Sequence, residues 1–461
     1  MAEDKDTEQE ATCLHVDKYM VPAKVSYFFQ NGKNAIVDYL MLFYTSTGLT
    51  PSEAGLVNGL QYIGGVIGNP LWGYVADKTQ HHRVIVWFLC FMAVVTLCVQ
   101  PIIGGVYSPE SNICPTNRTS TSPPIHVHER TSLFYSLLVA AILASSFDST
   151  VDSFVDTGVL LRVRTCPGGG ANIGMQRYAG SIGRSFASVM FSISMGYFPH
   201  GALSCYVGLF VTYYVFNVCT GVSAHFLYKD IVVMTEKEDG GSTNSLLWEY
   251  VKYLDSLLFF FSVLLNGVLQ SLYFSFLFLY LKTLHAPTLL LGFSITFNTV
   301  SAVTVYVFSE RIIRTLRGPS NAMCFTTFMW GLRFLCTASL ISPYVIFIID
   351  IFHGFTYSLF RVSYLKYVNE TADERICTTV CGIANALYKC CSFLLANIVG
   401  GKLYEIYGPK CLFNGAAALS FGWTMINIVY IFVKKRRTLV YDQLHESDSD
   451  TDAIDTETVR N

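Results

Sequence analysis

The chain of 461 residues is 52% hydrophobic and 15% aromatic, only 14% of its residues are charged, and its formal net charge is −2. Soluble domains are typically about one quarter charged, so this composition indicates a protein of the lipid bilayer. The balanced charge gives no sign of a nucleic-acid partner, which would require a strongly basic surface.

The first residues are polar and acidic and lack the apolar core of a signal peptide, so we expect 1–21 to form a cytosolic tail. After it, apolar segments of about 20 residues, the length that crosses a bilayer as a helix, recur along the chain. Residues 229–249 are polar and of mixed charge, which predicts a cytosolic linker between two six-helix halves, 22–228 and 250–433. The twelve predicted spans of this all-α membrane fold are 22–48, 51–76, 83–107, 131–161, 174–198, 203–228, 250–282, 287–308, 319–341, 344–367, 375–400 and 409–433.

Basic residues gather in the segments that would be cytosolic if both termini lay inside, among them Arg162, Arg164 and the run 434–437. The opposite loops carry few basic residues, so the positive-inside rule predicts that both termini are cytosolic. The long loop 108–130 would then lie outside. There, Asn117 of the tripeptide Asn-Arg-Thr would be open to glycosylation.

The last segment, 434–461, begins with a basic run and becomes acidic and rich in Ser and Thr. Such a composition cannot build a packed core, which predicts a disordered tail. Within it, Tyr441 to Leu444 matches the loose Y-x-x-Φ sorting pattern, so a sorting adaptor is a candidate partner and a chance match is the alternative. A multi-pass protein of the plasma membrane or of an endolysosomal membrane would fit these features.

The second predicted span ends in Gly73-Tyr74-Val75-Ala76-Asp77-Lys78. The pattern G-x-x-x-D-[RK] between the second and third spans resembles the signature loop of the major facilitator superfamily. The resemblance implies that Gly73 permits close helix approach and that Asp77 pairs with basic and helix-dipole charge. Gly73, Asp77 and Lys78 would then form a conformational-switch loop. The alternative is that Asp77 is only a helix-end carboxylate among basic residues.

Three further segments, 176–183, 352–357 and 400–408, resemble the branch called major facilitator superfamily domain-containing protein six. That branch is similar in fold to the lactose permease and nucleoside–proton symporter types. The resemblance covers residues 20–435 and implies a proton-linked or facilitative carrier of a small organic solute, without fixing the solute. Lys33 and Asp38, both in the first predicted span, are not part of this pattern.

Ionisable side chains inside the predicted spans cost about 2.5–3.5 kcal/mol each on insertion scales. The fourth span carries Asp148, Asp152 and Asp156 at intervals of four residues, which places all three on one helix face. At about 1.5 Å per residue, Asp152 and Arg184 both lie roughly 15 Å from the cytosolic side, and Lys33 lies at about 16 Å. We therefore expect Asp152 to meet Arg184, with Lys33 as a second partner, in a substrate-binding cluster.

A second cluster is expected in the other half. Asp350 and His353 share a face of the tenth span, and Arg333 and Lys389 on neighbouring spans reach a similar depth. Histidine is the side chain best suited to exchange protons near neutral pH, so these four residues are candidates for proton coupling. The alternative for both clusters is a set of fixed ion pairs that lock helix against helix, although buried pairs contribute little net stability.

Gln61 and Asn266 lie near mid-span and are expected to line the same cavity, although lone amides also bridge helices. The glycines of 64–68 and 180–183 favour tight helix crossings. No metal-ligand pattern and no nucleophile–base arrangement stands out in the sequence. We therefore expect no metal, no cofactor and no catalytic site.

Together with the resemblance, these features predict a secondary transporter of a small organic solute, whose two halves rock about a cavity at mid-membrane. Uptake coupled to protons is one option for such a carrier. The alternative is a transporter-shaped receptor or sensor that moves no solute and acts through the outside loop 108–130 and the tail. A carrier should bind a small molecule in its cavity, whereas such a receptor should respond only to proteins.

Overall fold

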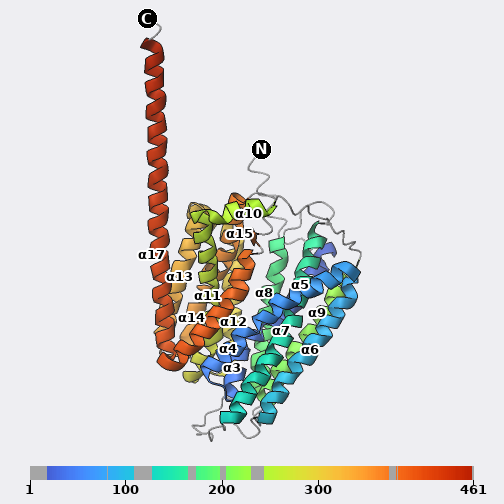
Figure 1. Cartoon of the computed structure of the whole chain (residues 1–461). Coiled ribbons are helices and arrows are strands. Elements are labelled where there is room, and N and C mark those ends of the chain that lie inside the picture. Colours follow the sequence, from blue (N-terminus) through green and yellow to red (C-terminus); the bar gives the residue numbers. More distant parts are fainter. Residues whose placement is uncertain are drawn as a thin grey trace.

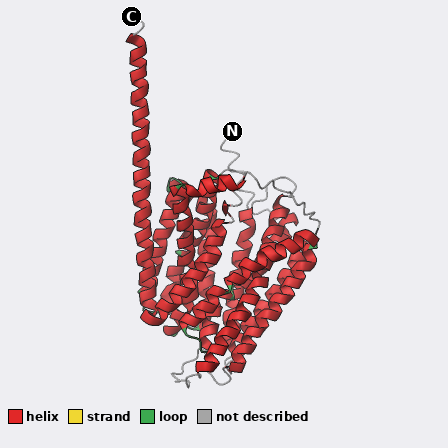
Figure 2. Cartoon of the chain, viewed as in Figure 1, coloured by secondary structure: helices red, strands yellow, loops and turns green. Residues whose placement is uncertain are grey.

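The computed structural model describes residues 18–79, 81–107, 127–164, 173–197, 204–229, 243–372, 380–381 and 383–458. In this part of the chain all regular structure is helical (Figures 1 and 2). The proximal end of the molecule is the end at which the described chain begins and α10 lies, at the top of Figure 1. The distal end is the opposite one, where α6 ends and α7 begins.

Helices from the first half of the chain pack mainly against one another, and we call them the N-terminal bundle. They are η2 Lys18–Met20, α2 Val21–Asn34, α3 Val37–Ser46, α4 Pro51–Leu60, α5 Tyr62–Thr79, α6 His82–Tyr107, α7 Val127–Arg164, α8 Ile173–Tyr197 and α9 Ser204–Leu227.

The remaining helices form the C-terminal bundle, on the left in Figure 1. They are α10 Thr243–Lys252, α11 Leu254–Thr283, α12 Thr288–Thr315, α13 Pro319–Ala338, η3 Pro343–Val345, α14 Ile346–Asp350, the π-helix η4 Gly354–Ser358, α15 Leu359–Thr371, the π-helix η5 Leu387–Cys391 and α17 Ser392–Thr458.

Helices occupy every predicted span, but not all are continuous. Among the described residues, six helices are long and apolar enough to cross a membrane: His82–Val106, Arg130–Val159, Tyr206–Leu227, Leu254–Thr283, Thr288–Thr315 and Ile383–Val433. The bent pair Pro343–Asp350 and Gly354–Thr371 would make a seventh. Other expected spans are divided by turns or are less apolar, which is why fewer than twelve stand out by length and composition.

The first expected span is broken between α2 and α3. Its backbone tightens there into bonds spanning three residues, from Ala35 N–H to the Gly32 carbonyl and from Ile36 N–H to the Lys33 carbonyl. The π-helices η4 and η5 are two further irregular stretches. Such distortions inside helices recur at functional sites. Lys33 lies just before the first of these three, His353 just before η4, and Lys389 within η5.

Glycines allow close helix crossings inside the N-terminal bundle, as the sequence predicts. A methyl group at Gly64 would lie 2.1 Å from the Ile142 carbonyl oxygen of α7, and one at Gly183 would lie 2.0 Å from the Phe28 carbonyl oxygen of α2. Because neither neighbour is a flexible side-chain end, both positions require glycine for these backbones to approach so closely.

The two bundles share one apolar core toward the distal end. Tyr39 of α3, Phe191 of α8 and Phe278 of α11 belong to a single cluster of buried side chains that crosses between the bundles. The ring centroids of Tyr39 and Phe278 are 5.0 Å apart. At the proximal end, by contrast, the buried apolar side chains form separate clusters, one around Val155 and Leu227 and others within the C-terminal bundle.

Polar contacts between the two bundles reinforce this shared core, and we call the whole contact the distal junction. The Nδ2 of Asn58 donates to Asn397 Oδ1 at 3.0 Å, and Ser185 of α8 bonds Thr296 of α12 at 3.0 Å. The Ser52 backbone N–H, in the first turn of α4, donates to the Glu405 carboxylate at 3.0 Å. Since a carboxylate is favoured at a helix N-terminus, Glu405 caps a helix of the opposite bundle.

The helix α17 turns back at Gly408, whose φ of 79° is in the left-handed region that favours glycine, and Pro409 follows. After this kink the helix rises along the C-terminal bundle and continues beyond it as far as Thr458 (Figure 1). The sequence predicts a disordered tail over 434–461, whereas the structure continues the helix through 434–458. Extending a helix that has already formed avoids the cost of nucleation, which accounts for the difference.

Candidate functional site

A charged cluster lies inside the N-terminal bundle, centred on Lys33 of α2. Its side chain is fully buried, and its ammonium lies 2.6 Å from Asp148 Oδ1 and 3.3 Å from Asp152 Oδ1, both on α7. Asp148 also accepts a hydrogen bond from the Tyr213 hydroxyl at 2.6 Å, and Asp152 accepts one from Asn34 Nδ2 at 2.5 Å. The expected contact between Lys33 and Asp152 is therefore present.

This first cluster holds two carboxylates against one ammonium, which leaves one negative charge when all three groups are ionised. The carboxylates are about one quarter exposed, at 24% and 26%. Charges withdrawn from water are tolerated when they are paired and hydrogen-bonded. The arrangement can therefore accept a proton or a cation, or exchange Lys33 between two nearly equivalent partners.

The expected pairing of Asp152 with Arg184 is wrong. Arg184 of α8 instead places Nη2 2.7 Å from both carboxylate oxygens of Asp38 on α3. Asp38 is 3% exposed and Arg184 35% exposed. The break between α2 and α3 sets the direction of Asp38, and sequence depth alone does not reveal that direction. The sequence shows Asp38 as a charge in the first predicted span, but no residue pattern points to its pairing with Arg184.

A second cluster lies inside the C-terminal bundle, with Arg333 of α13 at its centre. The Arg333 guanidinium is 2.9 Å from Asp350, with both side chains fully buried, and its Nη1 lies 3.0 Å from His353 Nδ1. It also donates to Asn298 Oδ1 at 2.7 Å. The Ser294 hydroxyl donates to the other Asp350 oxygen at 2.5 Å. The structure thus brings Arg333, Asp350 and His353 together, as expected.

His353 also packs against aromatic rings. It stacks on Tyr357, with centroids 5.2 Å apart and planes at 7°, and it meets the edge of Phe274. A guanidinium beside Nδ1 requires that nitrogen to be the acceptor, because Arg333 has only donors. His353 is thereby held as a neutral ring with its proton on Nε2 while Arg333 stays in place.

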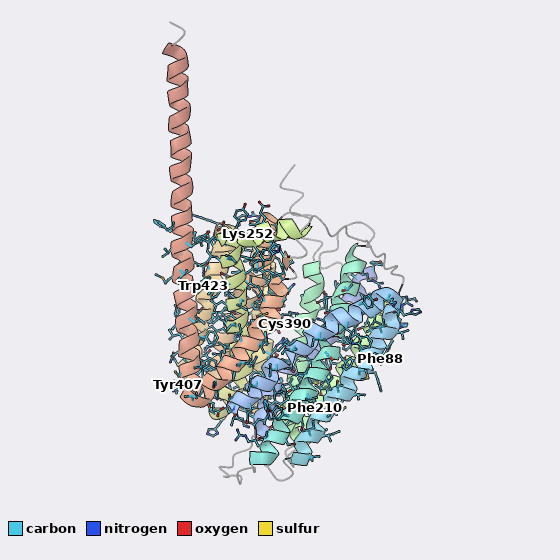
Figure 3. The ribbon with its side chains drawn as sticks, viewed as in Figure 1. Phe88, Phe210, Lys252, Cys390, Tyr407 and Trp423 are labelled. Atoms are coloured by element: carbon cyan, nitrogen blue, oxygen red, sulfur yellow. The ribbon has the colours of Figure 1, made fainter. Side chains whose placement is uncertain are left out.

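Lys389 does not join that cluster. It is exposed, and it interacts electrostatically with Asp152 of the opposite bundle rather than with Asp350. Cys390, the next residue, lies near the middle of the molecule where the two bundles face each other (Figure 3). The π-helix η5 adds a residue to the helical turn, which changes the direction of Lys389 from the one that regular helical spacing gives.

The two amides expected to line the cavity act as bridges in the structure. Gln61 donates to the Asn58 side chain at 2.7 Å and so joins the distal junction between the bundles. Asn266 is fully buried and donates to Thr327 of α13 at 3.0 Å, which links two helices of the C-terminal bundle. Neither amide is brought to the charged groups around Lys33.

The switch loop is only partly described. A methyl group at Gly73 would meet nothing within 4 Å, so close packing at that glycine is absent from this arrangement of the bundles. Lys78 is exposed and lies over the Tyr74 ring at 5.9 Å. The side chain of Asp77, the sequon at Asn117 and the side chains of Tyr441 to Leu444 lie outside the described part of the structure.

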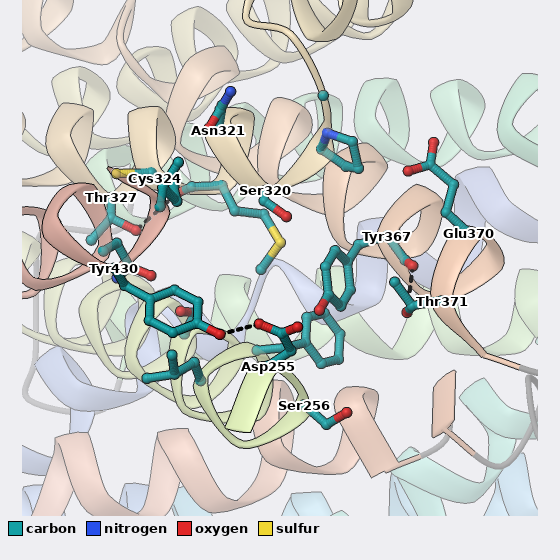
Figure 4. Close-up of a pocket in the computed structure, with 18 of the residues that line it drawn as sticks. Asp255, Ser256, Ser320, Asn321, Cys324, Thr327, Tyr367, Glu370, Thr371 and Tyr430 are labelled. Carbon is teal, nitrogen blue, oxygen red and sulfur yellow. Dashed lines mark hydrogen bonds between the residues drawn. The ribbon is translucent and has the colours of Figure 1, made fainter. Parts of the chain in front are cut away.

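A cavity of about 780 Å³ opens at the proximal end of the C-terminal bundle, among α11, α13, α15 and α17 (Figure 4). Its lining combines aromatic rings such as Tyr250 and Tyr367 with Glu370 and Asp255, and the Asp255 carboxylate accepts from the Tyr430 hydroxyl. This cavity contains none of the residues of the two charged clusters. Its chemistry is therefore separate from theirs.

Comparisons with known proteins agree on one relationship. The model of the MFS_1 like family matches residues 21–415. The chain is similar to the sucrose permease of Escherichia coli, with 21% identity over 406 residues that cover 86% of this chain and 88% of the permease.

Solved structures with the same fold include the nucleoside transporter NupG, with a TM-score of 0.65 and 16% identity over 90% of this chain and 99% of that one. An auto inhibited POT family peptide transporter has a TM-score of 0.61 and 10% identity, covering 90% of this chain and 97% of that one. At these identities the likeness shows a common fold.

Proposed function

The chain belongs to the MFS_1 like family, part of the major facilitator superfamily, and we propose that it is a secondary transporter that carries a small organic solute across a membrane by alternating access. In this proposal the twelve predicted spans form halves at 22–228 and 250–433, joined by the cytosolic linker 229–249, with both termini in the cytosol. Sucrose permease and the nucleoside transporter, whose names state small organic solutes, support this class of cargo.

The observation that carries the proposal is the division of the core. The apolar core is shared between the bundles at the distal end and separate at the proximal end. Between these regions each bundle holds its own charged cluster, and Lys389 of one bundle interacts with Asp152 of the other. A protein whose halves rock about a central site should have such a closed end, an opening end and charged groups between them.

In this scheme the structure is a state open toward the cytosol. Lys33, Asp148 and Asp152 act on the solute side of the N-terminal bundle, while Arg333, Asp350 and His353 form the candidate proton relay of the other bundle. A proton reaching Asp350 would release Arg333, and Arg333 could then exchange its contact with His353 for another acceptor. Helix-bound charges that change partners couple solute movement to a conformational step.

The test has two stages. Purified full-length protein in lipid nanodiscs is first screened for thermal stabilisation by a metabolite library, and the solutes that stabilise it are then assayed for uptake into proteoliposomes with and without an inward proton gradient. We expect uptake of at least one binder and its acceleration by the gradient. Binding without any flux would contradict the transporter assignment and favour a transporter-shaped receptor.

A matched pair of variants assigns the site. Asp152→Asn should abolish uptake because it removes the carboxylate that faces Lys33 and Lys389. Asp255→Asn, the same change at a carboxylate bonded to Tyr430 near the proximal end, should leave uptake largely intact. Normal uptake by Asp152→Asn would remove the first cluster from the mechanism.

A further inference from the structure

One buried cation of the C-terminal bundle has no carboxylate partner among the residues that the structure describes. Arg361 of α15 is 7% exposed, and no described carboxylate lies within 4 Å of its guanidinium. Its Nη1 donates to Asn385 Oδ1 at 3.1 Å, and its guanidinium carbon lies over the rings of Tyr364 and Tyr388 at 5.3 and 5.6 Å.

Two other buried arginines show how this chain satisfies the charge of a buried guanidinium. Arg333 pairs with Asp350 at 2.9 Å. Arg162, which is 8% exposed, donates to the backbone carbonyls of Tyr19, Phe226 and Leu227 at 2.8–3.1 Å. Within the described part of the chain, Arg361 has neither a carboxylate nor a set of backbone carbonyls as its partner. A buried charge without such a partner is costly, so the buried guanidinium of Arg361 points to an anionic partner that binds reversibly.

The surroundings of Arg361 connect it to the space between the bundles. Asn385 also accepts from the Tyr364 hydroxyl at 2.9 Å, and Lys389 follows it one helical turn later. Tyr357, four residues before Arg361, stacks on His353, and His353 meets the edge of Phe274. The guanidinium of Arg184, from the opposite bundle, lies over that Phe274 ring at 5.6 Å. Arg361 therefore lies at the wall of the same central region as Lys389 and Arg184.

The charge of this region favours an anion of one negative charge. Among the described residues, Arg333, Arg361 and Lys389 are the cations of the C-terminal bundle in this region. The buried carboxylate there is Asp350, which Arg333 already neutralises. Lys389 lies within electrostatic range of Asp152, in the first cluster, where two carboxylates face the single ammonium of Lys33. Among these described groups, Arg361 is the positive charge that no nearby carboxylate balances.

We propose that Arg361 is the anion-binding residue of the central site and that the solute is an organic monoanion whose carboxylate it holds. The planar guanidinium suits a carboxylate because two parallel N–H groups can bond both oxygens. The tyrosine rings beside it would pack against the body of the solute. This inference rests on the proposed transport function for its cargo, but binding alone can be tested without transport.

The probes are pairs of similar shape that differ in charge: nicotinate with nicotinamide, benzoate with benzamide, and acetate with acetamide. Each is titrated to 100 mM against full-length protein in nanodiscs, and thermal stability is recorded. We expect at least one carboxylate to stabilise the wild type with at least tenfold higher apparent affinity than its amide. Equal effects of the two members in every pair, or no effect of any carboxylate, would overturn the proposal.

Two variants separate ligand binding from a structural role. Arg361→Gln should lose the stabilisation by carboxylates. Without ligand, this variant should be as stable as the wild type or more so, because it removes an unbalanced buried charge while Asn385 keeps its hydrogen bond to Tyr364. Arg162→Gln is the matched control, and it should be less stable because three carbonyls lose their donor. A ligand-free Arg361→Gln protein as destabilised as Arg162→Gln, or an unchanged carboxylate response, would refute the assignment.

The two proposals fail in different ways. Carboxylate binding that depends on Arg361, without flux into proteoliposomes, would leave the anion site standing and remove the transport function. Flux of a neutral solute that Arg361→Gln does not alter would retain transport and remove the anion site.

Discussion

The pair of Arg333 and Asp350 allows a quantitative test of how the second cluster is held. Both side chains are fully buried with a separation of 2.9 Å, for which the Coulomb attraction is about 6 kcal/mol at an effective dielectric constant near 20. Desolvation of the two ions offsets most of this attraction. Removing one partner leaves the other charge buried without compensation, at a cost of about 3–5 kcal/mol.

We therefore expect Arg333→Met and Asp350→Asn each to destabilise the protein by about 3–5 kcal/mol. The double variant should cost less than the sum of the two single changes by about 2–3 kcal/mol, because neither charge is left alone. The measurement is a double-mutant cycle of reversible unfolding in mixed detergent micelles. Costs that add to within about 0.5 kcal/mol would refute the reasoning and show that the two groups contribute independently.

Three further predictions concern the distal junction and the first cluster. Gly55→Val should loosen the distal junction, because even a methyl group at Gly55 would lie 2.5 Å from the Asn397 carbonyl oxygen. Gly415→Val is the control, since a methyl group at Gly415 meets nothing within 4 Å. Amide hydrogen exchange over 51–60 should rise only in Gly55→Val, and equal exchange in both variants would contradict the contact. Glu405→Gln should raise amide hydrogen exchange at the start of α4 by a smaller amount, because it weakens the hydrogen bond to the Ser52 N–H without adding bulk. An effect as large as that of Gly55→Val would show that more than this helix cap is lost. Lys33→Met should destabilise the protein by about 3–5 kcal/mol, since it leaves the Asp148 and Asp152 carboxylates without their ammonium. Lys24→Met, at a half-buried site over the Tyr178 ring, should cost about 1 kcal/mol or less. Similar losses of stability in the two variants would show that the buried ion pairs of Lys33 contribute no more than the half-buried contact of Lys24.

The sequence by itself determined the features that depend on position along one helix. Segment lengths and apolar content predict where helices lie, and a rise of about 1.5 Å per residue predicts which charges share a depth. That reasoning places Lys33 beside Asp152, and Asp350 and His353 beside Arg333, as the structure has them. The glycines of 64–68 and 180–183 likewise predict close crossings, because the absence of a side chain is a local property.

Only the tertiary structure decided which way each charge faces and which bundle it meets. Arg184 and Asp152 share a depth, yet the break between α2 and α3 brings Asp38 to Arg184 instead. The π-helix at 387–391 directs Lys389 toward the opposite bundle. One residue added to or removed from a helical turn rotates all that follows by about 100°. The direction of a side chain therefore depends on backbone irregularities and on helix packing, which a pattern of residue types does not record.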